Sequence, residues 1–293
     1  MFASFNARAV GLALPAVETV ELAARHGFGG VDLLVRDLID AGEDPARIRG
    51  RMDSLGLRGG AWPLPVHWRG DEASYRADLA RLPDLARAAS ILGLYRTGTW
   101  VMPETPGPPD DDVEQAFKFH ARRLGPVSSI LADHGVAIGL EVIGVESFRP
   151  GLGRPMFVRF GGELIGQLLD RLREETPGVG LVTDAFHLHA AGEPIETAWR
   201  RGAASIVWAH VADLPAGADG NLQTIRDADR GLPGENGAVD CGGFLRGLAE
   251  AGYVGPVTVE PLTGCRSLTG LSVDAAVRKV ASALSATWPS PGR

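Results

Sequence analysis

Short apolar runs alternate with longer amphipathic runs along the whole chain. Runs of roughly four to eight apolar or β-branched residues predict buried strands. We predict strands at residues 2–5, 30–34, 57–62, 94–101, 136–141, 179–184, 205–210 and 257–260. Apolar residues at intervals of three and four predict helices between them. These helices are predicted at residues 15–25, 44–55, 71–92, 111–134, 162–173, 195–201, 242–251 and 273–286.

The order of these elements predicts the fold. Eight strand–helix repeats in sequence are what a closed (β/α)8 TIM barrel requires, and such a barrel typically needs about 250 residues. The chain has 293 residues, so we expect an α/β fold with a single TIM-barrel domain over residues 1–293. A doubly wound open sheet is the alternative, but residues 6–11 do not form the glycine-rich phosphate loop that usually follows its first strand.

Two long segments interrupt the regular alternation. Residues 144–160 follow the fifth predicted strand, and the polar, glycine-rich residues 212–240 follow the seventh. Loops this long inside a compact domain are commonly functional. Both leave the carboxyl ends of strands, which is where barrel enzymes carry their active sites.

Four polar residues each close or follow an apolar strand. They are Glu141, Asp184, His210 and Glu260. An ionisable group at the end of a buried strand is costly unless it is paired or binds a metal. Such a residue is often a helix cap or half of an ion pair, but four of them on strands five to eight would face one mouth of a barrel.

This donor set predicts one divalent metal ion. Carboxylates with a single imidazole suit Mn²⁺, which we expect first, and also Mg²⁺, Co²⁺ or Zn²⁺. No thiolate belongs to the set, which argues against a structural zinc site. Cys241 and Cys265 lie apart and indicate no disulfide framework.

Charge and hydropathy restrict the partners. The net charge is −7, which disfavours binding to nucleic acid and to anionic lipid. We see no signal peptide and no apolar stretch of the roughly 20 residues that a membrane helix needs. We therefore expect a cytoplasmic protein with a small-molecule substrate, and a homo-oligomer remains open.

Two motifs resemble a known family. Residues 179–192 (VGLVTDAFHLHAAG), and residues 225–240 (IRDADRGLPGENGAVD) followed by 252–261 (GYVGPVTVEP), are similar to the xylose-isomerase-like sugar isomerase/epimerase superfamily. The 2-keto-myo-inositol isomerase-like branch is the most similar. The resemblance is strong over residues 135–262 and consists only of the strand–helix alternation before that.

The resemblance implies roles for individual residues. Glu141, Asp184, His210 and Glu260 would bind the metal, and Glu141 and Glu260 would exchange the substrate proton. His187 and Arg230 match residues that contact substrate. The implied reaction isomerises or epimerises a keto sugar, or a cyclic keto-polyol such as an inosose. A proton next to the carbonyl leaves, and the metal stabilises the resulting enediolate.

Further residues are candidates from the sequence alone. Trp62 and His67 follow the third predicted strand and could form a wall or a hydroxyl partner for a sugar, although loop packing would also explain them. Asp213 follows His210 by three residues and could reach the pocket or cap the loop. Asp32 closes the second strand and could bind a substrate hydroxyl or cap a helix.

Other functions share parts of this pattern. The same proton abstraction could expel a β-hydroxyl or β-alkoxyl group, giving an inosose dehydratase or a 3-keto-glycoside lyase. An apurinic endonuclease of the same superfamily would need additional histidines for three zinc ions, and strand four ends without one. A non-catalytic sugar-binding barrel would not require two glutamates placed as bases.

Overall fold

The computed structural model describes the whole chain except residues 102–112, 149–156, 158, 177 and 291–293. Its strands are all parallel and form one sheet in the order β3-β2-β1-β9-β8-β7-β6-β5-β4. They are β1 (Phe2–Asn6), β2 (Gly30–Asp32), β3 (Arg58–Gly59), β4 (Trp62–Pro63), β5 (Arg96–Trp100), β6 (Ala137–Glu141), β7 (Val179–Asp184), β8 (Ile206–Val211) and β9 (Pro256–Val259).

The two ends of this order belong to one interrupted strand. β3 pairs with β2 and β4 pairs with β5, and only Gly60 and Ala61 separate them. The interruption has a local cause, because the Ala61 N–H donates to Asp32 Oδ1 at 2.8 Å instead of joining the ladder. With β3 and β4 counted as one, the sheet is a ring of eight strands, and the predicted TIM barrel is confirmed.

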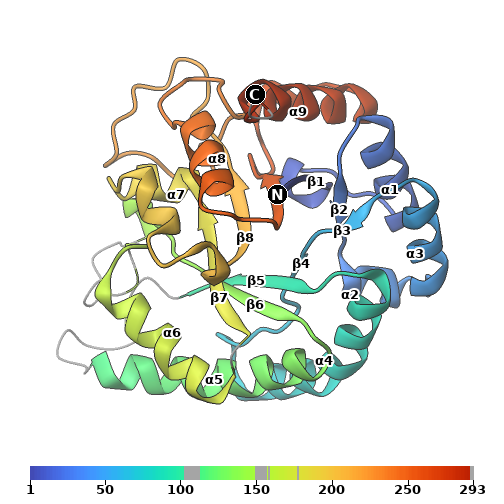
Figure 1. Ribbon diagram of the computed structural model, residues 1–293, viewed down its shortest axis with the longest axis vertical. Coiled ribbons are helices and arrows are strands. Elements are labelled where there is room, and N and C mark those ends of the chain that lie inside the picture. The colour runs from blue at the N-terminus through green and yellow to red at the C-terminus, as the bar shows by residue number, and fades with distance from the viewer. Residues whose placement is uncertain (102–112, 149–156, 158, 177, 291–293) are drawn as a thin grey trace.

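Helices surround the ring on its outside, as Figure 1 shows. The α-helices are α1 (Ala16–Arg25), α2 (Val35–Asp40), α3 (Pro45–Ser54), α4 (Glu72–Leu92), α5 (Val113–Asp133), α6 (Glu163–Glu175), α7 (Ala185–Ala190), α8 (Cys241–Glu250) and α9 (Val273–Thr287). Short 3₁₀ helices are η1 (Arg8–Val10), η2 (Glu146–Phe148), η3 (Ile195–Trp199), η4 (Ala203–Ser205) and η5 (Arg266–Leu268). No described helix has both the length and the apolar character needed to cross a membrane.

The predicted elements match most of these bounds, with three differences. The residues predicted as a helix at 195–201 form the 3₁₀ helix η3. The α-helix that follows β7 is α7, and the Asp184 side chain caps its start by accepting a hydrogen bond from the Phe186 N–H at 2.7 Å. The strand predicted at residues 30–34 ends at Asp32, because residues 35–40 form α2. The start of the predicted helix 111–134 and most of the loop 144–160 lie outside the described residues.

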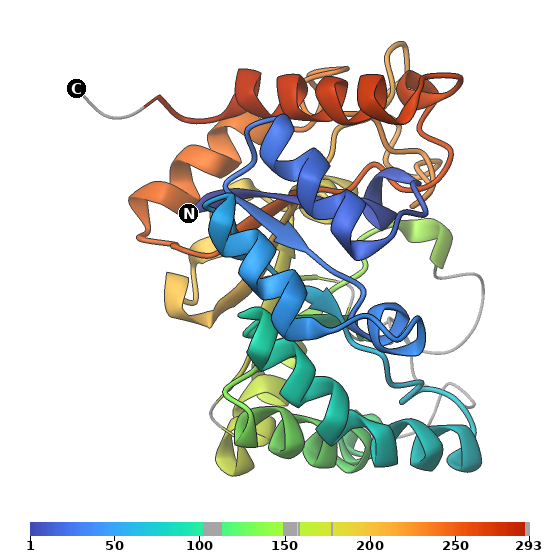
Figure 2. The ribbon, with the colours of Figure 1, turned by 90° about the vertical axis from the view of Figure 1, so that its right-hand side faces the viewer.

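One end of the barrel carries the long loop that follows β8. Figure 2 shows this loop, residues 212–240 in orange, on the opposite side of the molecule from the N-terminus, where β1 begins. Within it, the described chain has one isolated bridge, between Asp213 and Gly231. The loop therefore covers the carboxyl ends of the strands, where the four predicted ligands lie.

Candidate metal centre

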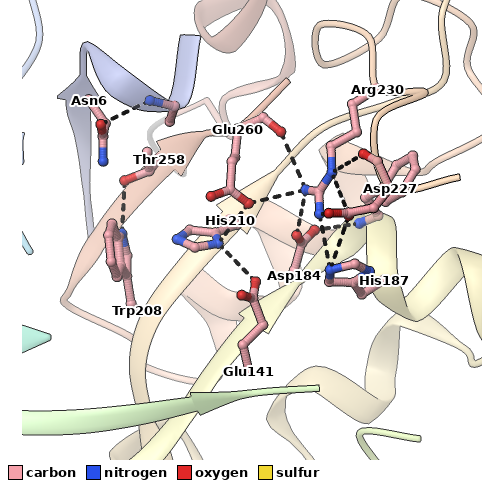
Figure 3. A network of polar contacts seen from close by, with 12 residues as sticks. Asn6, Glu141, Asp184, His187, Trp208, His210, Asp227, Arg230, Thr258 and Glu260 are labelled. Atoms are coloured by element: carbon pink, nitrogen blue, oxygen red, sulfur yellow. Dashed lines mark hydrogen bonds and ion pairs between the residues drawn. The ribbon is translucent and has the colours of Figure 1, made fainter. Parts of the chain in front are cut away.

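The four predicted ligands converge at the carboxyl ends of adjacent strands. Glu141 ends β6, Asp184 ends β7, His210 lies next to the end of β8, and Glu260 directly follows β9. Each offers one ligand atom, and these atoms all lie within 4.8 Å of one another. Figure 3 shows His210 between the carboxylates of Glu141 and Glu260.

Strand alternation explains why these side chains share the barrel interior. Residues two apart on a strand point to the same face, so a second layer lies directly beneath the ligands. That layer consists of Gly139, Val182, Trp208 and Thr258. Gly139 has to be small, because a Cβ there would lie 2.8 Å from the Cγ2 of Val182. Val182 and Trp208 thus fill the barrel below the site.

Trp208 is fixed by a chain of buried hydrogen bonds. Its Nε1–H donates to Thr258 Oγ1 at 2.9 Å, and that hydroxyl donates to Asp32 Oδ2 at 2.6 Å. The other Asp32 oxygen accepts from Ser4 Oγ at 2.6 Å. Burial raises the pKa of Asp32 although these bonds oppose the rise. Asp32 therefore ties strands together in the interior and leaves no oxygen free for a substrate hydroxyl.

The imidazole of His210 faces the carboxylates through one nitrogen. Its Nδ1 lies 3.1 Å from Glu141 Oε1 and 3.3 Å from Glu260 Oε2. Burial alone would lower the pKa of His210, but the charges of Glu260 and Glu141 outweigh it and raise the pKa well above the ordinary value. The ring of Trp208 packs against His210 edge to face, with centroids 4.5 Å apart. His210 is thereby oriented with Nδ1 toward Glu141 and Glu260.

Arg230 organises the side of the cluster opposite His210. Its Nη1 donates to Asp184 Oδ2 at 2.7 Å and to Glu260 Oε2 at 3.2 Å, and its Nη2 donates to Asp227 Oδ1 at 2.6 Å. Burial would raise the pKa of Asp184, but the Arg230 charge outweighs it and holds that pKa well below the usual range. Asp184 thus stays ionised, and its orientation is fixed.

His187 completes this network. His187 Nε2 lies 3.0 Å from Arg230 Nη2 and 3.5 Å from Asp227 Oδ1. The other ring nitrogen, Nδ1, is buried and has no hydrogen-bond partner among the described residues. Neither His187 nor Arg230 is among the residues that line the cavity beside the ligands, and Arg230 bonds directly to Asp184 and Glu260, so contact of His187 or Arg230 with substrate stays a prediction.

The donor set fits a divalent cation. Three carboxylates and one imidazole nitrogen converge, and Arg230 neutralises only part of the charge of Asp184, Asp227 and Glu260. Without a bound cation, the raised pKa of His210 means that its protonated ring supplies the positive charge between Glu141 and Glu260, and a divalent cation would take over that role. Oxygen and imidazole donors suit Mn²⁺, Mg²⁺, Co²⁺ or Zn²⁺. In the described part of the chain this is the one cluster of histidine, cysteine and carboxylate side chains that could hold a metal ion.

A cavity of about 370 Å³ opens beside the ligands. Glu141, His210 and Glu260 line it from one side. The remaining lining residues are Asn6, Arg8, Ala9, Leu34, Pro63, Leu64, Arg69, Gly98, Thr99, Trp100, Val182, Trp208, Leu262 and Thr263. This volume suits a small polyhydroxylated molecule. The sequence pattern indicated neither Arg69 nor Trp208 as part of this site.

Two predicted substrate contacts lie elsewhere, and this corrects our expectation. Trp62 is completely buried on β4 and does not reach the cavity, because the alternation of its short strand turns the ring into the packed interior. The His67 side chain is 73% exposed, and its Nδ1 lies 2.7 Å from Asp78 Oδ2. Trp100, at the end of β5, provides the aromatic wall that we expected from Trp62.

Asp213 is also not a cavity residue, and its role is to hold the loop after β8. The residue is fully buried, and its carboxylate accepts four backbone N–H bonds. These donors are Leu214 at 2.7 Å, Asn236 at 3.0 Å, Gly237 at 2.6 Å and Val239 at 3.0 Å. Its own backbone bonds to Gly231, next to Arg230, at 2.7 and 3.2 Å. Asp213 thus positions Arg230 indirectly.

Comparison with known proteins identifies the family. The sequence model of the xylose isomerase-like TIM barrel family matches residues 20–281. The chain belongs to this family. That residues 1–293 form one domain remains our prediction.

Curated relatives of this xylose isomerase-like barrel are inosose isomerases. The protein of that name from Bacillus subtilis (strain 168) is 31% identical over 147 residues, which are 50% of this chain and 48% of the relative. The one from Bacillus licheniformis is 37% identical over 142 residues, 47% of this chain and 44% of the relative. The matches thus span about half the length of these relatives.

Solved structures share the fold. A xylose isomerase domain protein from Alicyclobacillus acidocaldarius has a TM-score of 0.79 at 24% identity and covers 97% of both chains. The IOLI protein, whose crystal structure holds a zinc atom, has a TM-score of 0.75 at 21% identity and covers 98% of both chains. At these identities the likeness concerns the fold alone.

Proposed function

We propose that this protein is a divalent-metal-dependent isomerase or epimerase of a keto sugar or an inosose. The observation that carries the proposal is the convergence of Glu141, Asp184, His210 and Glu260 within 4.8 Å beside a cavity of about 370 Å³. The inosose isomerase relatives support the substrate class. The zinc atom in the IOLI structure supports a divalent cation without deciding between Mn²⁺ and Zn²⁺.

Different residues of the chain would bind the cation and transfer the proton. When bound, the cation supplies positive charge beside the substrate oxygens, where negative charge develops as a proton leaves the neighbouring carbon. Glu141 and Glu260 approach from β6 and β9 on either side of His210. One carboxylate removes the proton, and the other returns a proton to the neighbouring atom or to the opposite face.

The supporting residues keep these groups in place. Arg230 holds Asp184 and Glu260 by donated hydrogen bonds. Burial alone would lower the pKa of Arg230, but the charges of Asp184, Asp227 and Glu260 outweigh it and keep the guanidinium protonated. Trp208 and Val182 close the floor of the cavity and exclude water from below. A fixed, dry site of this kind makes each charge more effective than it would be in water.

Metal analysis followed by hydrogen exchange tests the proposal. Purified protein should contain about one divalent ion per chain, and in D₂O it should exchange the proton next to the carbonyl of inososes or keto sugars, detected by NMR. Glu260→Gln and Glu141→Gln should each lower exchange by about 10²–10⁴-fold. Glu250→Gln, on the exposed side of α8, is the matched control and should exchange like the wild type.

Metal content separates the two roles of the glutamates. A Gln variant that keeps its metal but loses exchange has lost the base, whereas one that loses both has lost a ligand. Normal turnover by Glu260→Gln would overturn the acid–base assignment. Release of water from the substrate, in place of isomerisation, would identify a dehydratase.

A further inference from the structure

Arg69 is a basic residue of the cavity beside the ligand cluster. It belongs to the loop between β4 and α4, and it lines the same cavity as Glu141, His210 and Glu260. Its Nη1 donates to Thr99 Oγ1 at 3.1 Å and to the Trp100 carbonyl at 2.8 Å. Its Cζ lies 3.7 Å from the centroid of the Trp100 ring, so that ring covers one face of the guanidinium. Arg69 is therefore held in a fixed orientation.

This guanidinium has no acidic partner among the described residues. Arg36 pairs with Asp78 at 2.6 Å, and Arg230 pairs with Asp184 at 2.7 Å, whereas the contacts of Arg69 are a hydroxyl, a carbonyl and aromatic rings. Burial lowers the pKa of Arg69 to about 10. A cation withdrawn from water without a counter-ion is costly. The position thus favours an anion in the cavity.

One edge of the guanidinium remains available for that anion. In the described part of the chain, Nε and Nη2 of Arg69 have no hydrogen-bond partner, and neither belongs to the buried unpaired atoms. Two adjacent N–H groups in one plane match the two oxygens of a carboxylate. Arg8 also lines the cavity and adds a second positive charge. The cavity is therefore acidic at the metal centre and basic at Arg69.

We propose that the substrate carries a carboxylate that Arg69 binds, while its keto group lies at the metal centre. This inference rests on the proposed function and narrows its substrate class to a polyhydroxylated keto acid, either an open-chain keto-uronate or a cyclic keto acid. An anionic group is repelled by Glu141 and Glu260 and attracted to Arg69, so it orients the substrate in the cavity. The planar edge of Arg69 could also hold two oxygens of a phosphate, and the phosphate ester in the experiment below distinguishes the two anions.

Matched pairs of compounds test this inference on the metal-loaded protein. The open-chain pair is D-fructose and D-fructuronate, with D-fructose 6-phosphate as the phosphate arm. The cyclic pair is 2-keto-myo-inositol and a polyhydroxylated oxocyclohexane carboxylate. For each compound, exchange of the proton next to the carbonyl in D₂O gives kcat/KM, and titration calorimetry gives Kd without requiring turnover.

We expect the acid in at least one pair to be preferred over its neutral partner by about 10- to 100-fold. Arg69→Met should remove this preference, because it keeps the packing on Trp100 and deletes the charge. Arg69→Lys should keep part of it, because the charge remains and the planar edge is lost. The neutral partner measures how much of any loss comes from altered packing around Trp100, so the ratio of acid to neutral compound carries the test rather than either rate alone.

The outcomes separate this inference from the proposed function. Equal or weaker binding of the acid in both pairs, no measurable binding of either acid, or a preference that survives Arg69→Met would overturn the inference. Tighter binding of the phosphate ester than of D-fructuronate would overturn the carboxylate assignment. Arg69-dependent binding of an acid without proton exchange in any compound would instead overturn the proposed isomerase and leave the carboxylate subsite standing.

Discussion

Replacement of Asp213 tests whether one buried carboxylate holds the loop that carries Arg230. Asp213→Ala removes the acceptor for the backbone N–H groups of Leu214, Asn236, Gly237 and Val239. Hydrogen bonds to a charged acceptor contribute about 1.5–3 kcal/mol each. The sum over four such bonds exceeds the loss of unfolding free energy that a single substitution usually causes. The actual loss should be smaller, because the partly exposed N–H groups of residues 236 and 237 can bind water in the variant.

We therefore expect Asp213→Ala to lower the free energy of unfolding by about 4–5 kcal/mol. Asp213→Asn is a milder substitution at the same position. One oxygen of Asp213 accepts from Leu214 and Val239 and the other from Asn236 and Gly237, so an amide can keep only one of these pairs. Its cost should be smaller, about 3 kcal/mol.

Urea denaturation followed by fluorescence measures both values. Limited proteolysis should cut the Ala variant within residues 212–240 faster than the wild type, and its metal affinity should fall because Arg230 loses its fixed position beside Asp184. A loss of less than about 1 kcal/mol in the Ala variant would refute the reasoning. If the Ala variant is clearly destabilised but binds metal as tightly as the wild type, only the proposed link from Asp213 through Arg230 to the metal site is refuted.

Three further changes have definite expected outcomes. Thr258→Val should cost about 2–4 kcal/mol in urea, because it leaves Trp208 Nε1 and Asp32 Oδ2 unpaired, and Thr258→Ser should restore most of the loss. Burial lowers the pKa of His120 to about 4. The unfolded chain therefore takes up a proton at this site below about pH 6.5 and the folded chain does not, so stability falls by up to about 3 kcal/mol as the pH drops toward 4. His120→Phe should flatten this part of the pH profile, and an unchanged slope would contradict it. Removal of the divalent ion with a chelator should lower Tm by about 5 °C if the ion was present at 100 times its Kd, and an equal Tm would argue against a bound ion.

The strand pattern predicted the barrel and the cluster of four polar residues because both depend on local sequence. Apolar runs with a period of two form the strands, and a polar residue at the end of each run marks the mouth. Glu141, Asp184, His210 and Glu260 all lie where this rule places them. Helix α7 was not predicted, because its start depends on the Asp184 side chain as a cap within a continuous apolar stretch.

The supporting residues depend on contacts between distant segments, which no local pattern reveals. Arg230 meets Asp184 across 46 positions, and Asp32 meets Thr258 across 226. Whether Trp62 or Trp100 faces the cavity depends on the register of two short paired strands. Arg69 stands in a loop, and that it has no acidic partner among the described residues becomes visible only from the folded structure.

The closure of the ring also has a consequence for synthesis of the chain. β1 is synthesised before the other strands, yet one of its edges pairs with β9, where Phe2 lies opposite Pro256. That edge of β1 therefore stays unpaired until more than 250 further residues have been synthesised. The four ligands lie on the last four strands, so the metal centre is also completed only when Glu260 has emerged. A nascent chain interrupted before that point has an open sheet edge and lacks a ligand, and chaperone capture should be strongest in that interval.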